Sequence, residues 1–267
     1  MKFTIRCDIE GVTGVTTYEQ ADNSDFGKAM LVNDLNAVIE GLLSTGDHQI
    51  VIYDEHSDGR NVILNDLLDS VSVICGKPLY RADWGGIDSS YNAMIMVGFH
   101  ARSGVEEALM PHSYSRKNLN IRINGTVVGE IGMEAAIAAD FGVPTWLIAG
   151  DSAGVSEAEA IIPGVRTVAV KEAMGEFAAR CLPCKATTKL IYEAARDIVQ
   201  SPPNVELLKF GRPVTLEIDL ADSDYTEKLR SAYSKIFIKD NTIQIVGKTV
   251  TEVWSKYTRI QAEVKKQ

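Results

Sequence analysis

Short apolar runs alternate with longer helical stretches in this chain, and this order restricts the fold more than any other feature. The strand-like runs cover residues 3–9, 49–53, 71–74, 93–97 and 145–149. Between the first two, residues 26–43 carry apolar side chains at helical spacing, and Gly46 follows as a candidate C-cap. Strands that alternate with helices favour a mostly parallel sheet covered by helices, so we expect an α/β fold.

A hairpin and a second, smaller unit complete the expected organisation. Asn124-Gly125 stands between alternating apolar residues in 119–128, which is a strong signal for a β-hairpin, and a helix is expected to begin near Glu130. Residues 201–203, Ser-Pro-Pro, form the clearest break. Strands at 213–220 and 242–246 and helices at 222–233 and 250–260 are expected after it. We therefore expect a main domain over residues 1–200 and a C-terminal α/β subdomain over residues 201–267.

Composition excludes several classes of partner. The formal net charge of -9 argues against nucleic acid, because phosphate binding needs clustered lysine and arginine. No apolar stretch approaches the roughly 20 residues of a membrane-spanning helix, and the first residues run into a strand pattern rather than a signal-peptide core. The four cysteines do not resemble a disulfide framework, and Cys181 and Cys184 lack the strand-to-helix context of a redox motif. We expect reduced thiols, no membrane partner and a cytoplasmic location.

Acidic side chains end the first apolar run. If the strand continues to Glu10, Asp8 and Glu10 point to the same face with Cα atoms roughly 6 to 7 Å apart. Two carboxylates that close need a cation nearby, and no lysine or arginine is spaced to serve both. This pattern indicates a metal site.

Histidines follow two later strand-like runs. His56 and His100 come just after the second and fourth runs, and the carboxyl ends of parallel strands are where ligand sites assemble. His112 and Glu130 add ligand types that suit zinc or a similar divalent ion. His48 precedes its strand, so we expect it at the opposite edge of the sheet and outside the site. Any one of these histidines alone is more often an ordinary polar residue, and only their joint occurrence favours a metal.

The neighbours of His56 leave two interpretations open. Asp54 and Glu55 either orient the imidazole of His56 or are solvated charges.

Five motifs follow one another in the chain: Asp8-Ile9-Glu10-Gly11, Asp54-Glu55-His56-Ser57, Gly98-Phe99-His100-Ala101, Met110-Pro111-His112-Ser113, and Ile123-Asn124-Gly125 through Val128-Gly129-Glu130. In this order they resemble the zinc-dependent D-aminopeptidase family, a group of self-compartmentalising bacterial peptidases. The resemblance covers roughly the first 170 residues, and chance agreement of five motifs in order is improbable. Pro111 and Glu55 replace smaller polar residues in that pattern, a departure that concerns substrate preference rather than the metal.

The resemblance implies an aminopeptidase that releases N-terminal amino acids, D-amino acids in this family, from short peptides. It implies a catalytic role for His112 beside two zinc ions per chain, and a ring-shaped homo-oligomer such as a decamer of two pentameric rings. Asp8 is the favoured bridge between the metals, while proton donation, oxyanion stabilisation and nucleophilic attack all stay open for His112. The implied zinc ligands are Asp8, Glu10, His56, His100 and Glu130.

Two other functions use the same residue types. A two-metal amidase or phosphoesterase acting on another small substrate needs a similar ligand set, because two-metal sites polarise acyl and phosphoryl groups alike. A non-catalytic scaffold with a structural metal is the other alternative. The extra ionisable group at His112 favours the peptidase. The sequence does not distinguish a pocket for D-residues from one for L-residues.

Overall fold

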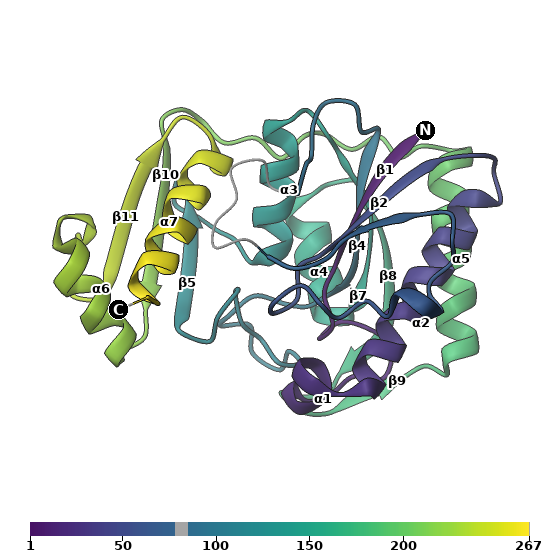
Figure 1. Cartoon of the computed structure of the whole chain (residues 1–267), viewed down its shortest axis with the longest axis horizontal. Coiled ribbons are helices and arrows are strands. Elements are labelled where there is room, and N and C mark those ends of the chain that lie inside the picture. The colour runs from purple at the N-terminus through teal and green to yellow at the C-terminus, as the bar shows by residue number, and fades with distance from the viewer. Residues whose placement is uncertain (78–84, 267) are drawn as a thin grey trace.

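Seven strands form the main sheet of the computed structural model, which describes residues 1–77 and 85–266 (Figure 1). Their order is β3-β2-β1-β4-β7-β8-β9, and each neighbouring pair is parallel except β8 with β9. This arrangement brings the carboxyl ends of β2, β1 and β4 side by side. The strands are β1 Lys2–Cys7, β2 Gln49–Asp54, β3 Ser72–Ile74, β4 Ala93–Phe99, β7 Thr145–Asp151, β8 Arg166–Ala173 and β9 Ala179–Cys181.

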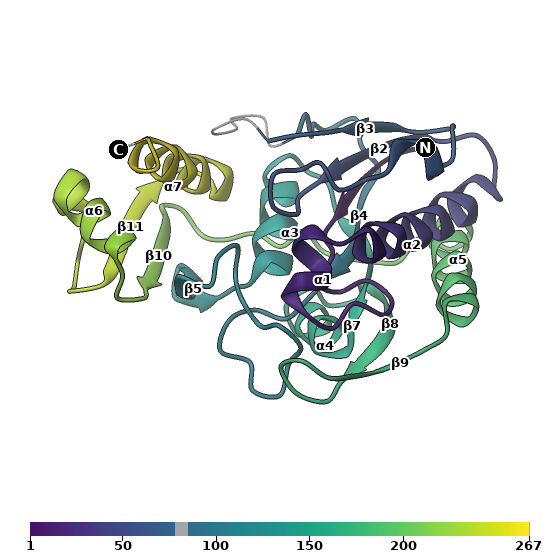
Figure 2. The same ribbon diagram turned by 60° about the horizontal axis from the view of Figure 1, so that its bottom comes forward.

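Helices cover both faces of the main sheet (Figure 2). The long helices α2 and α5 pack against each other on one face, and α3 and α4 cover the other. Capping side chains start two of these helices: Ser24 accepts from the Gly27 N–H to begin α2, and Asp151 accepts from two N–H groups to begin α4. The helices are α1 Tyr18–Asn23, α2 Asp25–Leu43, α3 Glu130–Asp140, α4 Ser152–Ile161 and α5 Cys184–Gln200.

A second, antiparallel sheet lies beside α3, in the order β11-β10-β5-β6. It combines a hairpin from the middle of the chain with two C-terminal strands. Helix α7 packs on α3, and its Trp254 and Tyr257 lie in one buried apolar cluster with Ile131 of α3 and Leu216 of β10. The two sheets therefore share one core through α3. These elements are β5 Asn118–Ile123, β6 Thr126–Val127, β10 Val214–Leu220, β11 Thr242–Gly247, α6 Asp224–Tyr233 and α7 Val250–Val264.

The expected α/β fold with a mostly parallel sheet is confirmed. The helix expected at 26–43 is α2, and the expected hairpin is β5 and β6. One expectation is wrong: β1 ends at Cys7, so Asp8 and Glu10 lie in the loop after the strand rather than within it. The structure also contains α1, α4, α5, β8 and β9, which were not predicted from the sequence.

The division of the chain at residue 200 stays a prediction. Helix α5 ends at Gln200, and a connection without regular structure leads from there to β10. The smaller sheet nevertheless takes β5 and β6 from the first 200 residues. All four cysteines are free thiols in the structure. Within residues 1–77 and 85–266, no helix combines the length and apolar character that crossing a bilayer requires.

An ion pair joins the middle of the chain to its C-terminal part in the smaller sheet. Arg122 of β5 donates to both carboxylate oxygens of Asp219 in β10, at 2.6 and 2.9 Å, and to Glu217 at 3.2 Å. The hydrogen bonds from Arg122 lower the pKa of Asp219 to about 2. Bidentate pairs of this kind are the stronger class of surface ion pair.

Replacing Asp219 with asparagine is expected to lower the free energy of unfolding by about 1 kcal/mol at pH 7, a value reduced for the partial exposure of the pair. The pKa is depressed in the folded state, so this stabilisation is present above about pH 4 and is lost as the pH falls towards 2. Urea unfolding of both proteins at pH 7 and pH 3 measures the difference. A gap that is equally large at pH 3 would contradict the electrostatic explanation.

Candidate metal centre

The first four side chains of the site lie just beyond the ends of three neighbouring strands. Asp8 follows β1 directly, His56 lies two residues beyond the end of β2, and His100 follows β4 directly. Glu10 lies in the loop after β1, where the Gly11 N–H donates to the Gly98 carbonyl at 2.7 Å. All four side chains are buried although each is polar. The strand order β2-β1-β4 therefore gathers them at one edge of the main sheet.

The other two side chains come from beyond β4. His112 lies in the loop between β4 and β5, and Glu130 is the first residue of α3, where an acidic side chain is also favoured by the helix dipole. Tyr114 fixes Glu130: its N–H donates to Glu130 at 2.6 Å, and its hydroxyl donates to Glu134, one turn further along α3, at 2.9 Å. The ring of Tyr114 packs 4.5 Å from that of Trp254 in α7. Tyr114 thus links the smaller sheet's helix to the site.

Asp8 lies at the centre of the cluster. One of its oxygens is 2.9 Å from His56 Nδ1, and the other is 3.5 Å from His100 Nε2. His56 Nδ1 is also 3.1 Å from Glu10, and His100 Nε2 is 3.4 Å from Glu130. Two ligands held about 2.0 to 2.2 Å from one tetrahedral zinc ion are roughly 3.3 to 3.6 Å apart. The observed spacings are therefore close to those of a zinc coordination shell.

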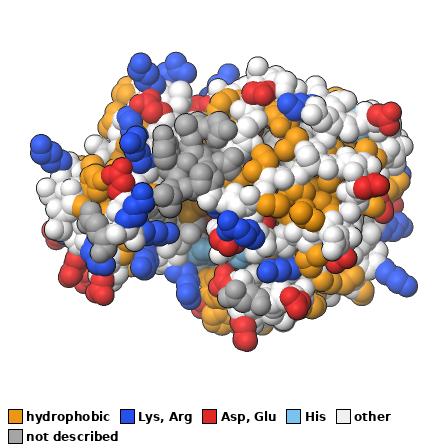
Figure 3. Space-filling view, viewed as in Figure 1, with side chains coloured by type: hydrophobic (Ala, Val, Ile, Leu, Met, Phe, Trp, Pro, Cys, Tyr) orange, Lys and Arg blue, Asp and Glu red, His pale blue; other side chains and the backbone are white. Residues whose placement is uncertain are grey.

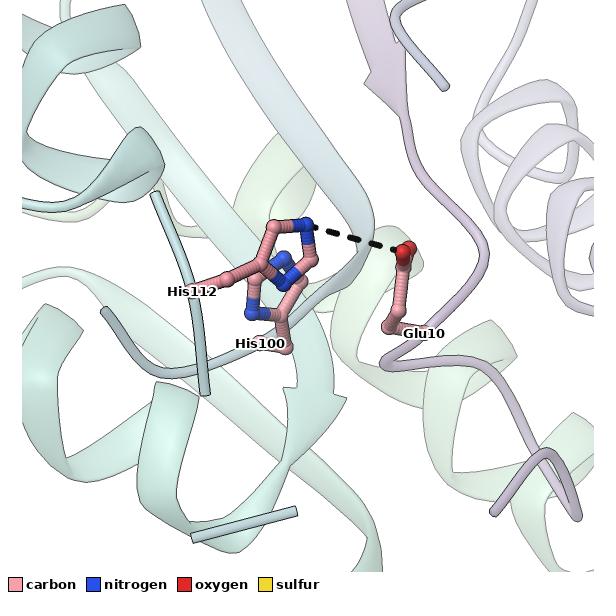
Figure 4. A group of neighbouring side chains, drawn as sticks. All are labelled: Glu10, His100 and His112. Atoms are coloured by element: carbon pink, nitrogen blue, oxygen red, sulfur yellow. Dashed lines mark ion pairs between the residues drawn. The ribbon is translucent and has the colours of Figure 1, made fainter. Parts of the chain in front are cut away.

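His112 lies at the open side of the cluster. Its Nε2 is 3.8 Å from both Glu10 and Glu130, and its ring stacks on that of His100 with centroids 4.3 Å apart (Figure 4). The side chain of His112 is 14% exposed, against 1% for His100. Histidine surface is visible in a hollow on one face of the molecule, with lysine and arginine side chains around it (Figure 3). The ring of Tyr18 contacts His112 edge-on at 5.7 Å.

Backbone carbonyls orient two of the imidazoles. Nδ1 of His100 lies 2.9 Å from the Ala101 oxygen, and Nδ1 of His112 lies 3.0 Å from the Met110 oxygen. Each Nδ1 therefore carries the proton and donates it to the carbonyl, which leaves Nε2 free to face the carboxylates. His56 has the opposite orientation, with Nδ1 inside the cluster and Nε2 3.5 Å from Asp22.

Several of these buried atoms lack a hydrogen bond. Among the described residues, Glu10 Oε2, His56 Nε2 and His100 Nε2 have no hydrogen-bond partner. Buried polar atoms are normally satisfied, so such a concentration indicates a group that completes the site. Three sets of three ligand atoms lie within 4.8 Å of one another, and Asp8, Glu10 and His100 each belong to two of them. The sets are Asp8, Glu10 and His56; Asp8, His100 and Glu130; and Glu10, His100 and His112.

The electrostatics of the cluster also favour a cation. Burial and then the charge of Glu10 raise the pKa of Asp8 to about 7. Burial alone would lower the pKa of His56, but the charge of Glu10 and the hydrogen bond to Asp8 raise it to about 11. Without a metal, protons on imidazole thus compensate the carboxylates. A divalent ion supplies the same positive charge in their place.

Comparison with known proteins decides the family. The family model for D-aminopeptidases matches residues 1–258. The chain belongs to the D-aminopeptidase family.

A curated D-aminopeptidase from Bacillus subtilis (strain 168) is 29% identical to this family member over 234 residues, covering 85% of this chain and 84% of that one. A solved structure, the Zn-dependent D-aminopeptidase DppA from Bacillus subtilis, described as a self-compartmentalizing protease, superposes with a TM-score of 0.91 at 25% identity. The superposition covers 100% of this chain and 98% of that chain. The whole described fold of this D-aminopeptidase family member is therefore shared with a solved relative.

The structure brings all six residues that the sequence singled out into one cluster of this family member. His48 lies elsewhere, as expected: its ring nitrogens contact the N-terminal amine and Thr45. Asp54 accepts the backbone N–H groups of His56 and Asn61, which shapes the loop, and Glu55 pairs with Arg6.

Sequence reasoning missed residues that hold the cluster in place. Tyr114 and Asp22 carried no pattern that pointed to the site. Lys171 lies in β8, a strand that was not predicted, and is 2% exposed. A lysine inside the apolar run of residues 168–173 was the one available signal, because lysine is almost never fully buried without partners.

Proposed function

We propose that this chain is a zinc-dependent aminopeptidase that releases N-terminal D-amino acids from short peptides. The observation that carries the proposal is the buried cluster of carboxylates and imidazoles at ligand spacing around Asp8. Family membership and the zinc dependence of the solved relative DppA support the metal and the reaction. We assign the five zinc ligands to Asp8, Glu10, His56, His100 and Glu130, and a catalytic role to His112.

Two zinc ions fit the cluster better than one. His56 and His100 approach different oxygens of Asp8, so Asp8 would be shared by the two ions. Glu10 and His56 would hold one ion, and His100 and Glu130 would hold the other. Zinc held there would lower the pKa of a water and polarise the peptide carbonyl that is cleaved.

The protein's own part in the reaction is orientation and proton transfer. The carbonyls of Ala101 and Met110 fix the tautomers of His100 and His112, so that Nε2 of each faces the reaction site. His112 is the more exposed of the two and is free to hold a proton at Nε2 for the departing amine, or to hydrogen-bond the oxyanion. Burial and the neighbouring His100 lower the pKa of His112.

The proposal is tested with paired D- and L-alanyl p-nitroanilides and dipeptides, with added zinc and with a chelator. Chelator-sensitive cleavage of the D-substrates with about two zinc ions per chain supports it, since the cluster offers two positions. A preference for L-substrates would keep the mechanism and overturn the stereochemistry. Cleavage of a phosphodiester instead would favour a phosphoesterase, and full zinc occupancy without turnover would favour a scaffold.

We also propose that the chain forms a ring-shaped homo-oligomer, for example a decamer of two pentameric rings, and acts in the cytoplasm. Support for the assembly comes from the solved relative, which is described as self-compartmentalizing. Free thiols throughout the chain support a reducing compartment. Light scattering after size exclusion measures the number of subunits, and a monomer would contradict the ring.

A further inference from the structure

The side chain of Lys171 ends in a cradle of backbone carbonyls. Its Nζ donates to the carbonyl oxygens of Glu10, Val12 and Val15 at 2.5, 2.7 and 2.5 Å. An ammonium group has three donors, and here all three are used on one loop. Three acceptors around one nitrogen require the charged ammonium form, because an uncharged amine has only two N–H donors. A buried cation is costly unless its donors are all satisfied, which this cradle achieves.

The buried carboxylate of Asp34 also binds the loop that Lys171 contacts. Asp34 of α2 is 1% exposed, and it accepts the Thr13 N–H and the Thr13 hydroxyl, each at 2.9 Å. The Val12 carbonyl and the Thr13 N–H belong to one peptide group. Lys171 therefore binds the negative end of this peptide dipole and Asp34 binds the positive end.

The loop held in this way begins with a residue of the metal centre. Lys171 binds the carbonyl of Glu10 itself, and the next residue, Gly11, is pressed against the end of β4. A Cβ at Gly11 would lie 1.9 Å from the Phe99 oxygen, so the backbone has no room to shift towards β4. The direction of the Glu10 carboxylate is thus set by Lys171 and by β4 together.

We propose that Lys171 is a positioning residue of the metal centre: a built-in cation that, with Asp34 as its counterpart, fixes the loop of residues 10–15 so that Glu10 meets the metal. This inference rests on the proposed zinc site. Lys171, in a strand of the main sheet and more than 150 residues from Glu10 in sequence, would thus orient a metal ligand. Residues that orient metal ligands typically change metal affinity by about 10- to 100-fold when they are replaced.

Lys171→Met tests the proposal, because methionine keeps an unbranched side chain without the charge. Zinc binding to the metal-free protein is measured by competition with a chromophoric chelator, and circular dichroism checks the fold. We expect zinc affinity to fall about 10- to 100-fold, with a lower kcat and a nearly unchanged KM. Affinity within about twofold of the wild type would overturn the proposal.

A matched control separates positioning from general destabilisation. Ile191 of α5 is fully buried in the core cluster that also contains Leu35 of α2, and its aliphatic side chain has no hydrogen-bonding or metal-binding atom. Ile191→Ala is expected to lower Tm without changing zinc affinity. If both variants lose affinity in proportion to Tm, Lys171 acts through stability alone and the proposal fails.

Chemical rescue tests the cationic role directly. Lys171→Ala leaves three carbonyls around a space that methylammonium or K⁺ can enter. We expect either cation, at millimolar concentrations, to raise zinc affinity at least about threefold in Lys171→Ala and to leave the wild type and Ile191→Ala unchanged. If neither cation restores the lost zinc affinity, the loss is caused by altered packing and the proposal is overturned.

A double variant tests the partnership with Asp34. If Lys171 and Asp34 act through the Val12–Thr13 peptide, Asp34→Asn combined with Lys171→Met lowers zinc affinity by less than the product of the single effects. A multiplicative loss would contradict the shared peptide. Wild-type protein that binds no zinc would instead refute the proposed function, whatever the variants do.

Discussion

Replacing Asp8 with alanine is expected to remove both zinc ions and to reduce peptidase turnover at least about 1,000-fold. The reason is that Asp8 lies between the two proposed metal positions, with a separate oxygen towards His56 and towards His100. Every other ligand belongs to one proposed metal position only. Metal analysis after gel filtration and turnover of a D-alanyl amide measure the two effects.

The fold is expected to survive this substitution. Burial and the charge of Glu10 disfavour the ionised form of Asp8, so its removal relieves repulsion in the metal-free protein. We expect Tm of the metal-free Asp8→Ala variant to equal or exceed that of metal-free wild type. Asp8→Asn, which keeps the shape, is a second test, and His48→Ala, at the other edge of the sheet, is the control that retains zinc. Full zinc content in both Asp8 variants would contradict the bridging role.

Replacing His112 with alanine is expected to leave zinc content intact and to lower kcat by about 100- to 10,000-fold. His112 is the most exposed of the three histidines in the cluster, and its Nε2 is further from the carboxylates than the corresponding nitrogens of His56 and His100. Loss of zinc equal to that of Asp8→Ala would contradict this division between metal binding and catalysis.

The leaving group distinguishes the roles of His112. If His112 donates a proton to the departing amine, the variant loses more activity on a dipeptide than on a p-nitroanilide, whose weakly basic amine needs less protonation. If it stabilises the oxyanion, both substrates lose activity by a similar factor. Trapping of a covalent acyl-enzyme on His112 would indicate the nucleophilic role instead. Asp22→Asn, which alters a neighbour of His56 without removing a proposed ligand, serves as the control.

Much of the site could be predicted because strand ends are visible in a sequence. Asp8, His56 and His100 each follow an apolar run, and parallel pairing of β2, β1 and β4 places such positions at one edge. The order in which the strands pair could not be predicted from the local sequence pattern. The rule that ligand sites assemble at the carboxyl ends of parallel strands brought these residues together in prediction, and the motif resemblance then assigned the ligand set.

Other parts of the site depend on contacts that no local pattern encodes. Lys171 donates hydrogen bonds to the carbonyls of Glu10, Val12 and Val15, which converge on its Nζ only once the loop after β1 has folded. Glu10 was placed in a strand because apolar alternation continues through Ile9, whereas ladder pairing with β4 ends at Cys7. Tertiary hydrogen bonds, such as that from the Gly11 N–H to the Gly98 carbonyl, determine the backbone conformation of the loop around Glu10.

The smaller sheet also sets an order for folding during synthesis. Strand β5 of the hairpin pairs with β10. Arg122 of β5 binds Glu217, which is synthesised 95 residues later. At about 5 to 20 residues per second, a ribosome needs roughly 5 to 20 s to make that stretch. During this interval the nascent chain holds β1, β2 and β4, while the hairpin that leads into Glu130 has an open edge. The edge of β5 that pairs with β10 therefore stays uncovered until late in translation, and a chaperone that shields residues 118–127 would act in that window.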